Sequence, residues 1–434
     1  MAFSVIRSAR SMVRPAEKTP SGMLDLSFMD KLPVVQHGVR SLHVYSHGHE
    51  PAKIIREALS RALVPYYPLA GRLKKSSNGD IQVSCTAEGV WFVEASSNCS
   101  LAAVNYFDNN FSTTTLHDED ELIPDHPPES DGLDLPIRMQ VTQFTCGGFV
   151  IGLVVSHAMC DGLGAAQFLK AVGEFARDLQ QPSPSIAPVW SREVIPTPTR
   201  LLAQATTKQK LLPQPPPLLL HDYKLEKAAF DISSDRISQL KREFQESTGQ
   251  TCTTFEAIAA SIWSSRTRAV SFHCDTKVTL MYLANGRQLC NPPLPEGFYG
   301  NCFFPVSIKA SSKTVSLASN AEVVKLVQEE KSRQKEEFSK WMDGVFSEPG
   351  ENPYDPSIAY KKLVISEWGR LGFNQVDLGW GPPVHMIPLD GYGIVPLVII
   401  GTPPTPKKGI RLMTWCVKGT HMPHLVEEMK SSLA

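Results

Sequence analysis

The sequence predicts a mixed α/β protein built from two domains. Strand and helix patterns follow one another in both halves of the chain, and its 434 residues exceed what one ordinary hydrophobic core encloses. Nine prolines between Pro182 and Pro217 cannot continue a helix or a central strand. We therefore expect an N-terminal domain over residues 1–181, a proline-rich crossover linker over 182–221 and a C-terminal domain over 222–434.

The N-terminal domain is predicted to begin with a helix and two strands. Pro51 opens a helix with one apolar face, and Pro65 ends it. Residues 81–85 and 90–94 have the pattern of two strands paired as a hairpin. The segment 117–134 is acidic and contains prolines, which indicates a loop whose charges face solvent.

The stretch from residue 137 to residue 176 organises this half of the chain. Residues 137–141 alternate like a half-buried strand, and 146–148 turn the chain back. Residues 149–155 are continuously apolar, which predicts a strand buried on both faces. Apolar residues then recur at helical spacing over 165–176. His157 therefore lies where a core strand stops.

The C-terminal domain is predicted to mix helices and strands in the same way. Thr253 and Glu256 form a capping-box pattern before an apolar helix. A long charged helix is predicted over about 320–342. The predicted strands of this domain are 278–283, 363–368, 395–400 and 410–416.

The composition argues against a nucleic-acid or membrane partner. Lys plus Arg (43) nearly balance Asp plus Glu (44), so no global field attracts an anionic polymer or surface. The chain has no apolar run of about 18 residues, and residues 1–14 lack the features of a secretion signal. The nine cysteines are scattered without CxxC pairs, which favours reduced thiols. We expect a globular cytoplasmic protein.

His157 is the first candidate for chemistry. Its imidazole can accept a proton from a hydroxyl at neutral pH, because the unperturbed pKa lies near 6.5. A histidine that simply caps a core strand is the competing interpretation. Asp161, four residues later, either orients the imidazole or fixes the loop. The HxxxD spacing alone does not choose between these interpretations.

Four ordered motifs resemble those of the plant BAHD acyltransferases. Residues 157–162 read HAMCDG and match the family's HxxxDG motif, and 377–381 read DLGWG and match its DFGWG motif. Residues 26–30 are similar to the early LSxxD segment, and 291–301 to the PPLPxGYxGN stretch. The resemblance covers nearly the whole chain, and Leu378 in place of the usual Phe is a hydrophobic exchange.

The resemblance implies a fold and a reaction. Family members have a two-domain, chloramphenicol-acetyltransferase-like architecture with mixed sheets and an interdomain channel. Acyl-CoA is a co-substrate, no cofactor or metal is bound, and an alcohol is converted to an ester. In this chain His157 would be the general base, and Asp161 would pair with Arg287 to hold the loop.

The resemblance also names residues around the base. Ser366 and Trp368 match the segment that helps hold the tetrahedral oxyanion, although Trp368 equally fits a strand end packed in the core. Ser41 and His43 match an early segment that lines the acyl or acceptor pocket in relatives. We expect all four side chains near the channel.

Two segments are candidates for the coenzyme A side of the channel. Thr253 and Thr254 begin a predicted helix, where free N–H groups and hydroxyls suit phosphate. The second segment is a rigid glycine-containing turn that shapes the channel in the family without taking part in the chemistry. Its residues are Asp377, Gly379, Trp380 and Gly381.

Two other chemistries are not expected. Cys160 lies inside the HxxxD motif, but a thiol nucleophile needs its own activating base. His421 and His424 are separated by Pro423 and lack a supporting pair of cysteines or carboxylates. We therefore expect neither an acyl-thiol intermediate nor a metal site.

Three segments look closest to p-coumaroyl-CoA monolignol transferases, namely 39–43, 298–302 and 381–385. We expect transfer of a hydroxycinnamoyl group to an alcohol in plant phenylpropanoid metabolism, by a monomer whose partners are small molecules. The alternative is a benzoyl- or acetyl-CoA alcohol or taxane-type O-acyltransferase. A non-catalytic small-molecule-binding protein of the same fold is the alternative from a different class.

Overall fold

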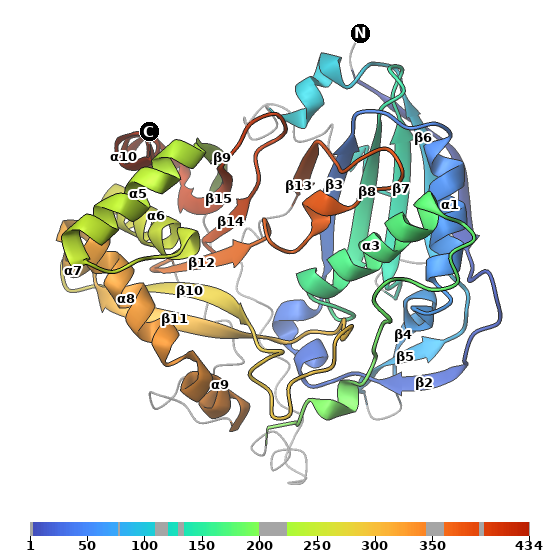
Figure 1. Ribbon diagram of the computed structural model, residues 1–434, viewed down its shortest axis with the longest axis horizontal. Helices are drawn as coiled ribbons and strands as arrows, with labels where there is room; N and C mark the ends of the chain where they lie inside the picture. Colours follow the sequence, from blue (N-terminus) through green and yellow to red (C-terminus); the bar gives the residue numbers. More distant parts are fainter. Residues whose placement is uncertain are drawn as a thin grey trace.

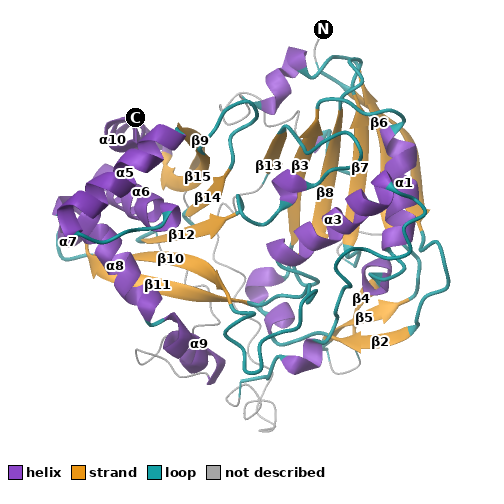
Figure 2. Ribbon diagram, viewed as in Figure 1, coloured by secondary structure: helices purple, strands orange, loops and turns teal. Residues whose placement is uncertain are grey.

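The computed structural model describes residues 3–76, 79–108, 120–128, 134–198, 224–343, 360–389 and 395–433. The described part forms two halves, each organised around a six-stranded sheet, with a smaller three-stranded sheet beside the first (Figure 1). Helices gather over one face of each large sheet (Figure 2). Among the described helices, none has the length and apolar character that crossing a membrane requires.

The first large sheet comes mainly from the N-terminal half. Its strand order is β1-β6-β7-β8-β3-β13, and only β6 and β7 are parallel neighbours. These strands are β1 (Val5–Val13), β3 (Gly38–Tyr45), β6 (Val90–Ser97), β7 (Ile137–Gln143), β8 (Phe149–Ser156) and β13 (His385–Pro388). The second half of the chain therefore supplies one edge strand, β13, to this sheet.

Two helices pack against one face of this sheet (Figure 1). They are α1 (Pro51–Ala62) and α3 (Gly162–Arg177). The sequence predicted both helices and β8, and these predictions are confirmed. Asp161 caps α3, because its carboxylate accepts the N–H of Gly164 at 3.0 Å. The strand, the loop and the capped helix together fix the position of His157.

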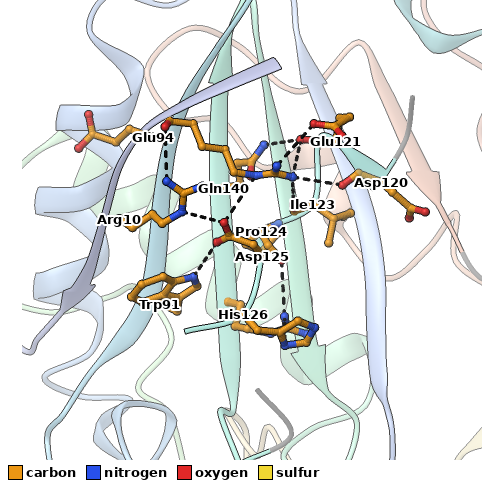
Figure 3. Close-up of polar contacts among 12 residues, drawn as sticks. Arg10, Trp91, Glu94, Asp120, Glu121, Ile123, Pro124, Asp125, His126 and Gln140 are labelled. Carbon is orange, nitrogen blue, oxygen red and sulfur yellow. Dashed lines mark hydrogen bonds and ion pairs between the residues drawn. The ribbon is translucent and has the colours of Figure 1, made fainter. Parts of the chain in front are cut away.

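Strand β7 is buried on both faces, and the prediction of a half-buried strand was wrong. The described segment 120–128 covers the face opposite the helices (Figure 3). Gln140 on this face is fully buried and donates to the carbonyl of Glu121 at 2.8 Å. Gly152 on β8 allows the close approach, because a Cβ there would lie 1.9 Å from the carbonyl oxygen of Leu122.

The predicted acidic loop lies partly outside the described residues, and its described part is not simply solvated. Asp125 lies 2.7 Å from the Nε of Arg10, and Asp120 lies 2.8 Å from an Nη of Arg40. Both carboxylates keep some exposure to solvent. The charges of this segment therefore help to hold it on the sheet (Figure 3).

The second large sheet comes from the C-terminal half. Its order is β11-β10-β12-β14-β15-β9, with β10–β12 and β12–β14 parallel. Its strands are β9 (Leu225–Ile232), β10 (Lys277–Asn285), β11 (Phe303–Ser311), β12 (Lys362–Glu367), β14 (Leu397–Gly401) and β15 (Ile410–Lys418). The predicted strands correspond to β10, β12, β14 and β15 and are confirmed, whereas β9 and β11 were not predicted.

Six helices accompany the second sheet in the described part of the chain. They are α5 (Ser234–Thr248), α6 (Thr254–Val270), α7 (Ser312–Leu317), α8 (Asn320–Ser332), α9 (Gln334–Asp343) and α10 (Met422–Leu433). The single helix predicted over 320–342 was wrong, because the chain leaves helical geometry at Arg333 (φ −90°, ψ 1°). The break lets α9 turn Phe338 and Trp341 into the core.

The predicted hairpin of 81–85 with 90–94 was also wrong. The three-stranded sheet consists of β2 (Gly22–Asp25), β4 (Arg72–Lys75) and β5 (Ile81–Cys85). β5 pairs with β2 and β4, whereas β6 pairs with β1 and β7. Gly89, at φ +96°, donates its N–H to the carbonyl of Ala70 at 2.9 Å. This glycine redirects the chain between the two sheets.

The predicted crossover linker is described only up to residue 198. This part is packed against the protein, because Val189 forms a β-bridge with Phe298 and Arg192 is buried. The rest of the predicted linker lies outside the described residues. The domain boundaries at 181 and 222 stay a prediction, and β13 shows that the two halves also share a sheet.

Candidate active site

A cavity of about 590 Å³ lies between the two halves of the protein. One wall comes from β3, β8 and the loop before α3, and the other comes from β10, β11, β12 and the start of α6. Its volume lies in the range of ordinary small-molecule sites. Among the sequence-predicted residues, those that line it are Ser41, His157, Asp161, Thr253, Arg287, Ser366 and Trp368.

His157 is held in place by hydrogen bonds of its main chain, and the residue lines the cavity. Its N–H donates to the carbonyl of His37 at 2.8 Å, and its carbonyl accepts from the Asn301 side chain at 2.7 Å. The ring packs edge-on against those of His37 and Phe303, with centroids 5.3 and 5.8 Å away. The imidazole is therefore half-buried in a cavity wall.

Burial lowers the pKa of His157. Its own main chain, the charge of Asp161, and Asn301 oppose this shift without cancelling it. Burial and the charge of His157 likewise lower the pKa of His37 to about 3. Both rings are therefore uncharged at neutral pH, and His157 is in the form that accepts a proton.

Asp161 makes a bidentate ion pair with Arg287. Each carboxylate oxygen lies 2.8 Å from one Nη of the guanidinium. The same carboxylate accepts the N–H of Gly164 at 3.0 Å and that of Cys302 at 3.1 Å. Among the described residues, none of its hydrogen bonds goes to His157. Asp161 therefore ties the loop to α3 and to the second half of the chain.

The electrostatics of this pair favour the charged forms. Burial alone would raise the pKa of Asp161, but Arg287 and the backbone donors hold that pKa below its usual value. Burial would lower the pKa of Arg287, and Asp161 outweighs it. The pair is largely buried and fully hydrogen-bonded, so removing one partner would strand the other charge.

A second buried network, which the sequence analysis did not identify as part of the site, supports the same loop. Asp30 is fully buried and accepts from the Asn301 side chain at 2.8 Å, and its other oxygen lies 3.0 Å from the Nε of Arg192. Arg192 in turn donates to the carbonyl of Met159 at 2.7 Å. The early motif, the start of the predicted linker and the 291–301 stretch thus meet around His157.

Ser366 and Trp368 lie at the end of β12 and face the cavity. The indole N–H of Trp368 donates to the hydroxyl oxygen of Ser366 at 3.2 Å. A hydroxyl that accepts one hydrogen bond still has its own proton to donate. The geometry therefore gives Ser366 a donor for a ligand oxygen and gives Trp368 the task of orienting it.

Ser41 and His43 are adjacent on one face of β3. Ser41 lines the cavity, and its hydroxyl lies 3.0 Å from the Nε2 of His43. His43 is fully buried behind it, is not among the residues that line the cavity, and has its pKa lowered to about 3 by burial. His43 therefore stays neutral and orients Ser41.

The start of α6 faces one end of the cavity. Thr253 caps the helix, accepting the N–H of Glu256 at 3.3 Å, while Thr254 is not among the lining residues. Lys331 pairs with Glu256 at 2.6 Å, and both Lys331 and Arg370 line the cavity. These two cations were not predicted, because their proximity to the cavity depends on how α8 and the loop after β12 pack.

The DLGWG segment lies against α3 and is not among the residues that line the cavity. Asp377 accepts the N–H groups of Gly379 and Gly381 at 2.8 and 2.9 Å, and both glycines have positive φ. Arg177 at the end of α3 donates to the carbonyl of Asp377, and the ring of Trp380 lies 5.5 Å from that of Phe149. These contacts describe a packed turn.

The Cys160 side chain is buried, and the His421 ring is hydrogen-bonded. Burial raises the pKa of the Cys160 thiol well above its usual value, so the nucleophilic thiolate is disfavoured. The Nδ1 of His421 lies 2.8 Å from the hydroxyl of Tyr360. Within the described ranges, no group of three or more His, Cys, Asp or Glu side chains has the geometry of a metal site.

The fold is the chloramphenicol-acetyltransferase-like architecture that the sequence predicted, and solved structures share it. The crystal structure of vinorine synthase matches with a TM-score of 0.71 at 20% identity, over 99% of this chain and 98% of that one. The structure of F. graminearum TRI101 complexed with coenzyme A and deoxynivalenol matches with a TM-score of 0.70 at 13% identity, over 94% and 97%. The predicted α/β architecture is confirmed.

A family model and similar sequences identify the family of this chain. A family model described as the Transferase family matches residues 3–431. The chain is 43% identical to acyl transferase 4 of Oryza sativa subsp. japonica and 39% identical to myricetin 3-O-glucosyl 1,2-rhamnoside 6'-O-caffeoyltransferase AT2 of Crocosmia x crocosmiiflora, over 99% of each chain in both cases. The chain belongs to this family, the plant BAHD acyltransferases, and is an acyl-CoA-dependent acyltransferase.

Proposed function

We propose that this enzyme transfers a hydroxycinnamoyl group, such as p-coumaroyl, from coenzyme A to the hydroxyl of an alcohol such as a monolignol. The observation that supports it best is the aromatic lining of the cavity beside His157. The aromatic side chains there are Phe255, Tyr282, Phe303, Trp368 and Phe373. Planar phenylpropanoid rings pack well against such surfaces. The caffeoyltransferase among the relatives supports the same donor class.

His157 is the proposed general base. It removes the proton of the acceptor hydroxyl as that oxygen attacks the thioester carbonyl, and the imidazolium then protonates the departing thiolate of coenzyme A. The hydroxyl of Ser366, oriented by Trp368, donates to the oxyanion, a contribution typically worth about 3 kcal/mol. Asp161 and Arg287 act by holding the loop.

The coenzyme A portion of the donor is proposed to approach the end of the cavity formed by α6. Thr253 begins this helix, and Lys331 and Arg370 also line the cavity, each paired with a carboxylate, Glu256 and Glu367 respectively. A helix start and two cations suit phosphate groups. Thr254 and the residues Asp377 to Gly381 would act indirectly, by shaping the surrounding backbone.

There are two alternatives to this proposed function. The acyl group could be benzoyl or acetyl and the acceptor an alcohol or taxane, since a family shares its chemistry more widely than its substrates. A non-catalytic binding protein of the same fold would keep the cavity without turnover. We further propose that the enzyme is a cytoplasmic monomer whose partners are small molecules, with no nucleic acid and no membrane among them.

A substrate panel tests this proposal. The enzyme is incubated with p-coumaroyl-, caffeoyl-, benzoyl- and acetyl-CoA, each with coniferyl alcohol, a flavonol glycoside and an aliphatic alcohol, and products are identified by mass spectrometry. We expect the highest kcat/KM with a hydroxycinnamoyl donor and a phenylpropanoid alcohol. A preference for benzoyl- or acetyl-CoA would overturn the proposed donor, and absence of any ester would favour the binding protein.

A further inference from the structure

Two cysteines lie side by side next to the active-site loop. The sulfur atoms of Cys290 and Cys302 are 3.9 Å apart, and both residues are buried. Cys302 borders the cavity with its own side chain fully buried, and Cys290 is not among the lining residues. None of the steps of acyl transfer uses either thiol.

The backbone holds the two cysteines together. The N–H of Gly286 donates to the carbonyl of Cys302 at 2.9 Å, and the carbonyl of Gly286 accepts the N–H of Cys290 at 3.2 Å. A Cβ at Gly286 would lie 3.2 Å from the sulfur of Cys302 and 2.9 Å from the ring of Phe338. The tight turn therefore brings the thiols together from positions twelve residues apart.

The two thiols differ in their chemistry. The hydrogen bond from Cys302 lowers the pKa of Cys290, burial opposes this, and the positive charge of Arg287 adds to the lowering. That same hydrogen bond and burial raise the pKa of Cys302. Cys290 is therefore the better nucleophile of the pair, and Cys302 is placed to resolve an oxidised sulfur.

We propose that Cys290 and Cys302 are a modification site at which hydrogen peroxide forms a disulfide that lowers acyl transfer. The Cys290 thiolate attacks one peroxide oxygen, giving a sulfenic acid and hydroxide, which takes up the proton that the thiol released. Cys302 then passes its proton to the departing sulfenic oxygen as its sulfur attacks the Cys290 sulfur, and the second water leaves. Two thiols are oxidised, one peroxide is reduced, and two waters leave.

Disulfide formation would disturb the active-site loop directly. A disulfide has its sulfur atoms about 2.05 Å apart, so the pair must approach by roughly 2 Å. The N–H of Cys302 donates to Asp161, and the neighbouring Asn301 donates to the carbonyl of His157. A shift of the backbone just before β11 would therefore move Asn301 and Cys302, which hold the loop that carries His157.

The test treats the full chain with hydrogen peroxide and then maps cysteines by differential alkylation and mass spectrometry. We expect a Cys290–Cys302 disulfide and a turnover at least tenfold lower with the best substrate pair of the panel, with both effects reversed by dithiothreitol. The mapping needs no substrate, so it is independent of the proposed donor. Cys290→Ser is expected to keep basal turnover and to resist peroxide, whereas the matched variant Cys85→Ser stays sensitive.

Three outcomes would overturn the proposal. The first is that the exposed Cys146 and Cys274 are oxidised while Cys290 and Cys302 remain alkylatable. The second is a mapped disulfide with unchanged turnover. The third is an equal loss of turnover in Cys290→Ser, which would assign the peroxide sensitivity to another residue such as Cys160.

Discussion

At the scale of single residues, His157 and Asp161 lie in one short loop but have different roles. The His157 ring faces the cavity, whereas the Asp161 carboxylate is fully engaged with Arg287, Gly164 and Cys302. A buried charge that loses its partner costs on the order of 3 to 5 kcal/mol. The two motif residues should therefore differ in what their loss does to the protein.

Asp161→Asn and Arg287→Met should each lower the free energy of unfolding by about 3 kcal/mol or more, and turnover with it. The double variant strands neither charge, so its loss should fall short of the sum of the single losses by at least about 1 kcal/mol. Urea denaturation of the four proteins measures this coupling. Strict additivity would contradict the ion-pair role.

A more exposed ion pair provides the control for that cycle. Arg268 and Glu428 lie 2.6 Å apart with about a third of each side chain exposed, 31% and 30%. Solvent screens such a pair, so Glu428→Gln should change stability by less than about 1 kcal/mol. Turnover should not change, because neither residue lines the cavity.

The pH dependence of turnover follows from the lowered pKa of His157. The base must be neutral, so kcat/KM should rise with pH, and the midpoint of that rise should lie below the ordinary histidine value of 6.5. Steady-state rates from pH 4.5 to 8 measure the rising limb. A midpoint above 6.5 would contradict the effect of burial on this imidazole.

The motifs alone predicted His157, Asp161 and Ser366 as site residues, and all three line the cavity. They did not identify His37, Arg192 or the cavity role of Phe303, whose positions depend on pairing between distant segments. Ser41 and His43 were both expected at the pocket, and both lie on β3. Sequence could not show that one faces the cavity and the other is fully buried behind it.

At the scale of elements, two capping boxes allow a matched comparison. Thr253→Ala on α6 and Ser319→Ala on α8 should each cost about 1 kcal/mol of stability, because each removes an N-cap. Only α6 starts at the cavity, so Thr253→Ala alone should raise the KM for acyl-CoA several-fold. Equal KM values in both variants would contradict the proposed donor end.

Helices and strands with a strong local sequence pattern were predicted well, whereas the pairing of strands and the breaks between helices were not. The continuous apolar run of β8 and the helical spacing of α3 are properties of the local sequence. The separation of β5 from β6 depends on Gly89, and the break after α8 depends on what α9 can bury. Both errors arise where tertiary packing overrides a local pattern.

At the scale of the whole molecule, buried neutral histidines should make the folded protein less stable as the pH is lowered. Burial lowers the pKa of His37 and His43 to about 3 and that of His385 to about 4. The unfolded chain takes up these protons near pH 6.5, so unfolding is favoured as pH falls from 6.5 towards 4. The slope is about 1.4 kcal/mol per pH unit for each histidine.

Urea denaturation at pH 7.5, 6.5 and 5.5 measures that slope. Stability should fall by about 1 kcal/mol between pH 7.5 and 6.5 and by about 3 kcal/mol more between pH 6.5 and 5.5. A midpoint that does not change between pH 6.5 and 5.5 would contradict the buried neutral state of these rings.

The whole fold was predictable because ordered motifs identified a family, and not because strands could be paired from the sequence. Composition and patterning alone indicate only a mixed α/β protein with two halves. The contribution of β13 to the first sheet and the packing of the DLGWG turn on α3 are long-range features without a local signal. The substrate is set by cavity shape, which depends on side chains from both halves.

The most direct test of the central claim is the turnover of His157→Ala with the best substrate pair of the panel. We predict a kcat at least about 100-fold lower, with thermal stability and acyl-CoA binding unchanged, because a positioned base contributes 10² or more. His424→Ala, which removes an exposed histidine, should retain full turnover. A His157→Ala enzyme that kept more than about a tenth of the wild-type kcat would contradict the assignment of His157 as the base.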